Sequence, residues 1–140
     1  MKYLLDTNVL SEFRRLDPDA NLTAWLRAAD EQGLHVSVAT LGELRAGVAC
    51  LERGRRKANL DEWLRRDLPL RFRGRILDIT MAIADLWGVL SAEAKRRGVG
   101  VGAVDKYLAA TAIVHDMTLV TRNTKDFEAF DLSVLNPWKD

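Results

Sequence analysis

The chain has 140 residues, of which 48% are hydrophobic and 29% are charged, and its formal net charge is +1. This length fits one domain that buries about two-thirds of its unfolded surface, so we expect a single domain over residues 1–140. No apolar run is long enough to span a membrane, and no leader precedes the first predicted strand, so we expect a cytoplasmic protein. A single cysteine excludes an intramolecular disulfide and a thiolate zinc site.

Strand-like apolar runs alternate with helix-like apolar spacing along the whole chain. In the first third of the chain, we predict a buried strand at 3–5, a helix over 9–13, an amphipathic helix from 22 ending near Gly33, a strand at 35–38 and a helix over 41–51. A polar helix at about 59–66, a weak strand or turn at 76–77 and a long helix at about 80–97 follow. The last third should hold a helix of small residues over 108–113, a strand at 118–121, a short helix near 126 and an edge strand at 132–135. This alternation predicts an α/β domain whose central sheet is mainly parallel, has four or five strands and is flanked by helices.

The first strand ends abruptly in an acid, Asp6. The carboxyl ends of parallel strands face the crevice in which ligands bind, so Asp6 is the first catalytic candidate. In the structural alternative, Asp6 or Asn8 only caps the following helix.

Three further acids, Glu43, Asp105 and Asp126, occupy comparable places near strand ends or helix starts. Each has a structural alternative: Glu43 and Asp126 fit capping boxes that begin at Thr40 and Asn123, and Asp105 could favour a helix dipole. Four converging acids would repel one another unless a cation neutralised them. Oxygen ligands without cysteine or paired histidines suit Mg²⁺ or Mn²⁺, which could polarise a phosphodiester and orient a water for in-line attack.

Four ordered motifs carry a family resemblance: Leu-Leu-Asp6-Thr-Asn8-Val-Leu-Ser-Glu, Ser37-Val-Ala-Thr-Leu-Gly-Glu43-Leu, Asp105-Lys-Tyr-Leu-Ala-Ala-Thr-Ala and Leu-Val-Thr121-Arg-Asn123-Thr-Lys-Asp126-Phe. Together they resemble the PIN-domain ribonucleases, specifically the VapC-like toxins of bacterial toxin–antitoxin pairs. The resemblance extends from Lys2 to Trp138.

This resemblance implies a three-layer PIN-like fold and an endoribonuclease that forms a homodimer and is inhibited by a cognate antitoxin. It further implies that Asp6, Glu43, Asp105 and Asp126 surround Mg²⁺ or Mn²⁺, with Asn8, Thr121 and Asn123 as polar supports. One departure is the bulky pair Lys106 and Tyr107, where the family usually has small or apolar residues. From the sequence we expect that pair to stand beside the metal pocket.

Residues 53–75 carry nine Lys or Arg against three acids, within a chain of net charge +1. Such a local excess favours phosphate contacts, and we expect an RNA substrate. The residues predicted to contact RNA are Arg53, Arg55, Arg56, Arg71, Arg73 and Arg75. The alternatives are a solvated helical face and a docking face for an acidic partner.

Two other classes of protein share parts of this pattern. A phosphatase of the haloacid-dehalogenase type also begins with a strand ending in an acid, but it needs a second acid where this chain has Asn8. The stronger alternative is a catalytically weak binding module that acts with a DNA-binding partner. In this alternative, replacing the basic surface residues changes the biological effect of the protein, whereas replacing the four acids does not.

Overall fold

The computed structural model, described here for residues 1–139, has a sheet of five parallel strands at its centre in the order β3-β2-β1-β4-β5. The strands are β1 (Tyr3–Leu5), β2 (Leu34–Ser37), β3 (Ile76–Leu77), β4 (Thr118–Val120) and β5 (Val134–Leu135). β1 lies in the middle of this order and pairs with β2 and β4. The prediction of a parallel sheet of four or five strands is therefore confirmed.

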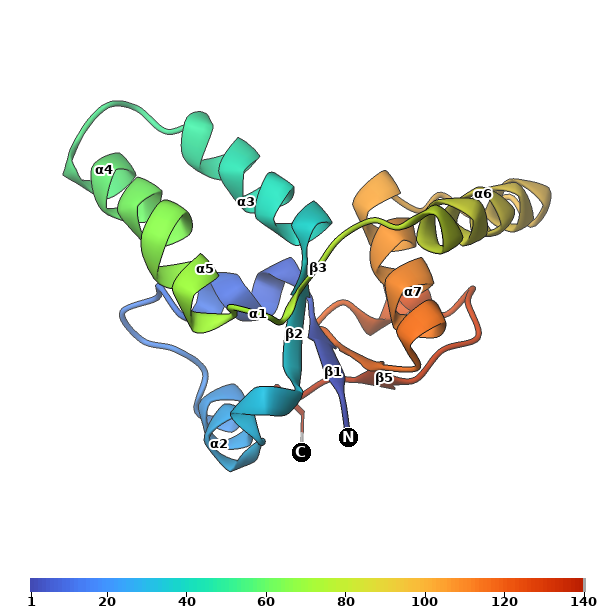
Figure 1. Cartoon of the computed structure of the whole chain (residues 1–140), viewed down its shortest axis with the longest axis horizontal. Helices are drawn as coiled ribbons and strands as arrows, with labels where there is room; N and C mark the ends of the chain where they lie inside the picture. Colours follow the sequence, from blue (N-terminus) through green and yellow to red (C-terminus); the bar gives the residue numbers. More distant parts are fainter. Residues whose placement is uncertain (140) are drawn as a thin grey trace.

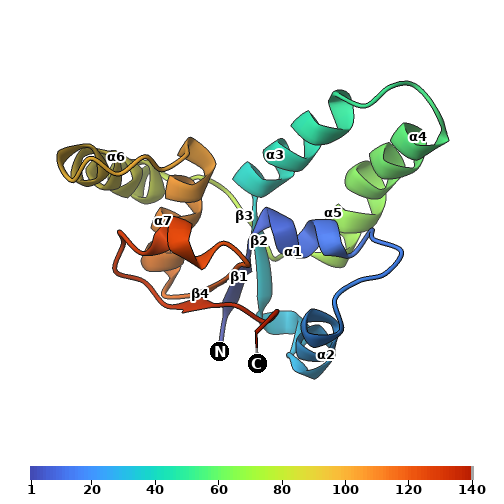
Figure 2. The ribbon, with the colours of Figure 1, turned by 180° about the vertical axis from the view of Figure 1, so that it is seen from behind.

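Helices cover both faces of this sheet and make three layers (Figures 1 and 2). The α-helices are α1 (Thr7–Glu12), α2 (Ala20–Ala28), α3 (Val38–Ala49), α4 (Arg55–Glu62), α5 (Leu68–Arg71), α6 (Met81–Arg96) and α7 (Ala103–His115). Helices α1 to α5 lie on one side, where α3 and α4 project as a hairpin, and α6 and α7 lie on the other (Figure 1). None of the helices within residues 1–139 is both long and apolar enough to cross a membrane.

Two apolar cores lie against the two faces of the sheet, and β1 contributes to both. Leu5 packs with Val9, Leu10 and Phe72 in one core, whereas its neighbour Leu4 packs with residues of α6 and α7 in the other. Successive side chains of a strand point to opposite faces, which explains why an unbroken apolar run suits a strand covered on both sides. The carboxyl end of this buried strand delivers Asp6 to the edge of the sheet.

Three short turns of other helical types complete the chain: the 3₁₀ turns η1 (Glu31–Gly33) and η3 (Thr124–Phe127), and the π-helical turn η2 (Trp63–Asp67). The second predicted helix ends at Ala28 and not near Gly33, because Ala29 is extended and Asp30 begins the separate turn η1. The predicted polar helix is longer than expected, because η2 joins α4 to α5 without a break.

Candidate active site

The buried carboxylate of Asp6 is the centre of a hydrogen-bonded cluster at the carboxyl end of β1. Its side chain is 5% exposed. Oδ1 accepts the backbone N–H of Thr7 at 2.6 Å, and Oδ2 accepts the hydroxyl of Thr121 at 2.7 Å. Asp6 also caps α1, so its capping and site interpretations are compatible.

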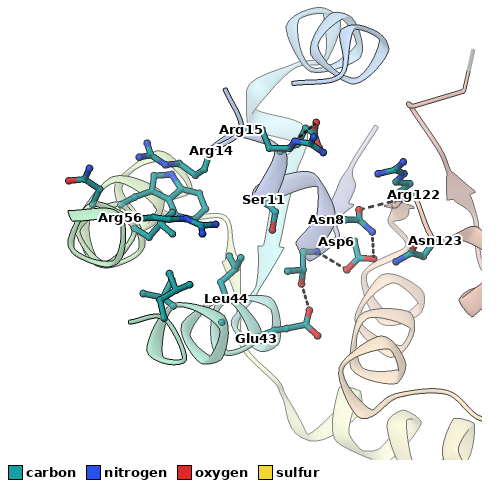
Figure 3. A pocket seen from close by; sticks show the side chains of 18 of the residues that line it. Asp6, Asn8, Ser11, Arg14, Arg15, Glu43, Leu44, Arg56, Arg122 and Asn123 are labelled. Carbon is teal, nitrogen blue, oxygen red and sulfur yellow. Dashed lines mark hydrogen bonds and ion pairs between the residues drawn. The ribbon is translucent and has the colours of Figure 1, made fainter. Parts of the chain in front are cut away.

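The predicted polar supports lie around Asp6. Asn8 donates to Asp6 Oδ2 at 3.4 Å and to Thr121 Oγ1 at 3.3 Å, and its Oδ1 accepts the backbone N–H of Arg122 at 3.3 Å. The backbone N–H of Asn123 donates to Thr121 Oγ1 at 3.0 Å. This arrangement joins the ends of β1 and β4 into one polar cluster (Figure 3).

Glu43 reaches the cluster from α3, and the structure removes its capping-box alternative. The N-cap of α3 is Ser37, whose hydroxyl accepts the N–H of Ala39 at 3.0 Å, whereas Thr40 is buried within the helix. The exposed side chain of Glu43 instead accepts a hydrogen bond from the hydroxyl of Thr7, next to Asp6. Thr7 was not singled out from the sequence.

The other two acids come from the opposite side of the sheet. Asp105 lies half-buried in the first turn of α7, in agreement with its dipole alternative, and Asp126 is exposed in η3. α7 contacts both α3 and η3, which carries Asp105 towards the other acids. The predicted capping bond from the Asn123 side chain is not formed in η3.

Neighbouring acids act electrostatically on Asp105 and Asp6. Burial and the charges of Asp6, Asp126 and Glu43 raise the pKa of Asp105 to about 6. Burial also raises the pKa of Asp6, although hydrogen bonds from Thr121 and Thr7 oppose the change, and the charges of Glu43 and Asp126 contribute to it. Raised pKa values identify carboxylates that a cation would stabilise in the charged form.

The donor set fits a hard divalent cation that keeps part of its water shell. Within residues 1–139, no three Asp, Glu, His or Cys side chains form a group able to hold an ion by themselves. Mg²⁺ usually takes only one or two carboxylates from a protein and completes its shell with water and phosphate oxygens. An incomplete acidic cluster therefore suits Mg²⁺ or Mn²⁺ shared with a phosphate-bearing substrate.

A cleft of about 1200 Å³ opens at this edge and contains Asp6, Glu43 and Asp105 but not Asp126. Its other lining residues include arginines, apolar side chains, polar side chains such as Asn59, and the acid Glu12. The arginines are Arg14, Arg15, Arg55, Arg56 and Arg122, and the apolar residues include Leu44, Val48, Leu51, Leu60, Trp63 and Trp138. Figure 3 shows Arg14 and Arg56 across the cleft from Asp6, and Arg122 close to it.

Arg14, Arg15 and Arg122 lie outside the basic segment and were missed as candidates. The first two lie just after α1 and its C-cap Phe13, and Arg122 lies two residues after the last residue of β4, so their positions relative to the acids could have suggested them. Of the predicted arginines, Arg55 and Arg56 line the cleft, whereas Arg53 and Arg73 are exposed outside it.

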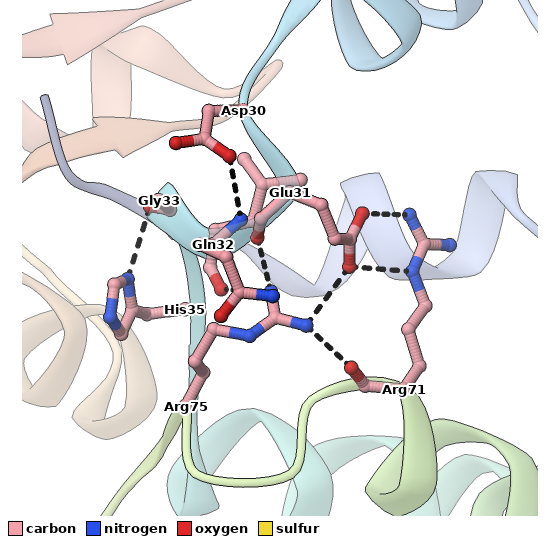
Figure 4. A network of polar contacts seen from close by, with 8 residues as sticks. Asp30, Glu31, Gln32, Gly33, His35, Arg71 and Arg75 are labelled. Carbon is pink, nitrogen blue, oxygen red and sulfur yellow. Dashed lines mark hydrogen bonds and ion pairs between the residues drawn. The ribbon is translucent and has the colours of Figure 1, made fainter.

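Arg75 is buried within the fold, contrary to the prediction that it faces RNA, whereas Arg71 is exposed and pairs with Glu31 (Figure 4). Arg75 is 7% exposed and donates to the carbonyls of Glu31, Leu34 and Arg71 and to the Glu31 carboxylate. Arg71 forms a two-bond pair with the same carboxylate. Burial would raise the pKa of Glu31, but its hydrogen bonds to Arg71 and Arg75 hold it below the usual value. These guanidiniums join η1 to α5. The burial of Arg75 removes it from the RNA-contact set, whereas a contact of Arg71 with RNA stays a prediction.

Lys106 and Tyr107 do not stand beside the metal pocket as expected. The Tyr107 ring stacks on Trp87 of α6 with centroids 5.1 Å apart, and the Lys106 ammonium lies 4.8 Å from the Trp87 ring centroid. Neither residue lines the cleft. On a helix, the residues one and two positions after Asp105 point away from its face, which removes this departure as an obstacle to metal binding.

Residues 3–132 match the family model for the PIN domain. The toxin FitB of Neisseria gonorrhoeae is 41% identical over 137 residues, covering 98% of this chain and 99% of FitB. The VapC ribonuclease Y4jK of Sinorhizobium fredii is 36% identical over 136 residues, covering 97% of each chain. A solved structure of FitAB bound to an IR36 DNA fragment has a chain that superposes with a TM-score of 0.90 at 39% identity, covering 99% of this chain and 96% of that one. These similarities therefore extend over nearly the whole chain.

Proposed function

We propose that this chain, which belongs to the PIN-domain family, is a divalent-metal-dependent endoribonuclease acting as the toxin of a toxin–antitoxin pair. The observation that carries the proposal is the convergence of Asp6, Glu43 and Asp105 in one cleft, with Asp126 close enough to raise the pKa of Asp6 and Asp105. The match to the PIN-domain model also confirms the resemblance first drawn from the four motifs.

In this proposal, Asp6, Glu43, Asp105 and Asp126 surround Mg²⁺ or Mn²⁺, which would bind one or two of these carboxylates directly and complete its shell with water and phosphate oxygens. The bound ion offsets the negative charge of the carboxylates and polarises a phosphodiester for hydrolysis. Thr121 and Asn8 keep the Asp6 carboxylate oriented through their hydrogen bonds. Thr7 does the same for Glu43. Fixed ligands of this kind reduce the rearrangement needed when a substrate enters.

The substrate is RNA, and the walls of the cleft support this choice. Cleft arginines supply the positive charge that a polyanion needs to approach four acids. We also propose that the protein acts in the cytoplasm as a homodimer. VapC ribonuclease Y4jK, a relative with 36% identity over the full length, is named for ribonuclease activity.

A cognate antitoxin completes the proposal. The relative FitB is named as a toxin. A solved structure similar to this chain is that of FitAB bound to a DNA fragment. The apolar part of the cleft, formed by Leu44, Val48, Leu60 and Trp63, offers a surface on which an apolar segment of a protein partner could be buried. An inhibitor bound there would lie next to the acids and would exclude RNA.

The test is cleavage of RNA by the purified chain. We expect cleavage with Mg²⁺ or Mn²⁺, no cleavage with a chelator, and inhibition by the protein encoded beside the gene. Binding of RNA without metal-dependent cleavage, together with a biological effect that survives loss of the acids, would favour the alternative function. In that alternative, the chain is a catalytically weak PIN-fold module that acts with a DNA-binding partner, and the FitAB–DNA structure is the observation in its favour.

The replacement Glu43→Gln separates a structural role of Glu43 from a role in the site. A glutamine oxygen can still accept the Thr7 hydroxyl, and Glu43 caps no helix, so the melting temperature should stay within about 2 °C. The lost charge should reduce cleavage about 100-fold or more, measured as kcat/KM at saturating Mg²⁺. Glu93→Gln on α6, outside the cleft, is the matched control. A fully active Glu43→Gln protein would return Glu43 to a structural role.

The double replacement of Arg55 and Arg56 by glutamine tests the RNA-binding wall on α4. Each lost phosphate contact should flatten the salt dependence of log Kd for single-stranded RNA by roughly 0.7 to 0.9. KM should rise, whereas kcat at saturating RNA should change less, because Arg56 lies across the cleft from Asp6 (Figure 3) and Arg55 precedes it on the same helix. Lys95 and Arg96, exposed in the last turn of α6, provide the matched double control. An unchanged salt slope with lost antitoxin binding would make this wall a docking face.

A further inference from the structure

We infer that Arg122, held between Asn8 and Trp138, is a phosphate-binding residue that positions the RNA strand at the acidic end of the cleft. The inference rests on the proposed function and adds to it a substrate-positioning residue that the four acidic motifs do not assign. It is carried by three features: the anchored backbone of Arg122, the free guanidinium of its side chain, and the aromatic ring beneath that side chain.

The backbone of Arg122 is anchored on both sides. Its N–H donates to Asn8 Oδ1 at 3.3 Å, and Asn8 in turn donates to Asp6. Its carbonyl accepts the side-chain amide of Asn136 at 3.5 Å. The Asn8 side chain therefore links the backbone of Arg122 to the Asp6 carboxylate. This link fixes where the Arg122 side chain begins relative to Asp6.

The guanidinium of Arg122 is available to a ligand. Its side chain is exposed and lines the cleft. Within residues 1–139 it forms no salt bridge and donates no side-chain hydrogen bond, whereas Arg15 of the same cleft pairs with Glu12. A guanidinium without a carboxylate partner keeps its donors for the two-bond recognition of a phosphate.

Trp138 orients this guanidinium. The Arg122 Cζ lies 5.8 Å from the centroid of the Trp138 ring, within the range of a cation–π contact. The backbone of Trp138 is itself held, because its N–H donates to Asn136 Oδ1 at 3.0 Å and its carbonyl accepts the side-chain amide of Asn21 at 3.0 Å. Asn136 thus contacts the backbones of both members of the pair. A guanidinium held over a ring by a cation–π contact can still donate to a ligand, so the pair is preordered for a phosphate.

The position of Arg122 suggests which phosphate it takes. The acids repel the strand at the place of cleavage, so neighbouring phosphates need cations on either side. Figure 3 shows Arg122 beside Asp6, Asn8 and Asn123, and Arg56 on the opposite wall. Arg122 is placed to bind a phosphate close to the scissile one, while α4 binds the strand farther along.

The experiment measures RNA binding and turnover for Arg122→Gln, Arg122→Lys and Trp138→Leu, with Arg96→Gln as the control outside the cleft. Binding is measured on an Asp6→Asn background, so that the RNA stays intact. Arg122→Gln should weaken binding about tenfold and flatten the salt slope of log Kd by roughly 0.7 to 0.9. In the otherwise unchanged protein it should raise KM more than it lowers kcat.

The two other variants separate charge from orientation. Arg122→Lys should keep the wild-type salt slope but recover only part of the affinity, because an ammonium cannot make the two-bond contact. Trp138→Leu should raise KM at an unchanged salt slope, because the charge stays and only its preordering is lost. If Arg122 had only a structural role, Arg122→Gln would leave the salt slope of log Kd unchanged. Arg122→Lys would then have no lost slope to restore.

Two results would overturn the inference. One is a salt slope and KM of Arg122→Gln equal to those of Arg96→Gln in a wild-type protein that cleaves RNA, which would leave the proposed function intact. The other is unchanged RNA binding with weakened inhibition by the antitoxin, which would assign Arg122 to the protein partner. A flattened slope on the Asp6→Asn background would support the phosphate contact even if the wild-type protein cut no RNA.

Discussion

Asp6→Asn is expected to lower RNA cleavage about 10³-fold or more while the protein stays folded. Asp6 is the most buried of the four acids, and its carboxylate connects β1, α1 and β4 through Thr7 and Thr121. Asparagine keeps one acceptor oxygen for these donors but loses the charge that the metal requires. Losses of this size are typical when a group that acts on the chemical step is removed.

The stability of Asp6→Asn distinguishes its catalytic role from its cap. Asparagine can still cap α1, but its amide group must face the Thr121 hydroxyl, which costs of order 1 kcal/mol. Removing a carboxylate whose pKa is raised by burial and by neighbouring acids acts in the opposite direction in the metal-free protein and offsets part of this cost. The free energy of unfolding should thus change by less than about 2 kcal/mol.

Cleavage assays with Mg²⁺ and urea unfolding without metal check these two expectations together. Asp85→Asn, an exposed position on α6, is the matched control and should resemble the wild type in both. Undiminished cleavage by Asp6→Asn would remove Asp6 from the active site. A large loss of stability would show instead that the charge of Asp6 serves the fold.

The central parts of the fold and site followed from local sequence patterns. A buried apolar run that ends in an acid predicted both β1 and the place of Asp6, because strand burial and strand polarity are properties of a few adjacent residues. The four acids were named from the same kind of pattern together with the family resemblance. Their electrostatic coupling appeared only when α7 and η3 were placed against the ends of the strands.

What the sequence did not reveal depends on contacts between distant segments. A run of arginines shows charge but not which guanidiniums are engaged, and Arg75 is engaged by Glu31, 44 residues away. The capping box expected at Thr40 does not form, because the backbone places the N-cap of α3 at Ser37. The direction of Lys106 was an avoidable error, because helix geometry already separates it from the face of Asp105.

The metal-free protein is expected to lose stability as the pH rises from about 4 to about 6, and Asp105→Asn should remove much of that loss. The pKa of Asp105 is raised from 3.8 in its usual setting to about 6 in the fold. In this window the folded chain therefore binds more protons than the unfolded chain, so the free energy of unfolding falls with increasing pH. Above about pH 6 the free energy of unfolding stays lowered by the full amount.

The expected size is of order 1–2 kcal/mol, after allowing for partial solvent screening of a half-buried group. At pH 7 without metal, Asp105→Asn should accordingly be more stable than the wild type, although it should not cleave RNA. The difference between the two unfolding curves is the quantity to follow. Carboxylates with lowered pKa values, such as Glu31 and Asp61, contribute with the opposite sign at lower pH in both proteins.

Added Mg²⁺ or Mn²⁺ extends this prediction to the ligand role of Asp105. An ion that binds only the folded state raises the free energy of unfolding, and protons compete with it for the carboxylates. Stabilisation by metal should hence be larger at pH 7 than at pH 5 in the wild type and nearly absent in Asp105→Asn. Asp85→Asn should retain both the pH dependence and the response to metal. If Asp105→Asn followed the wild-type pH curve and kept its full response to metal, Asp105 would be neither the raised carboxylate nor a ligand, and its place in the first turn of α7 would serve the helix dipole alone.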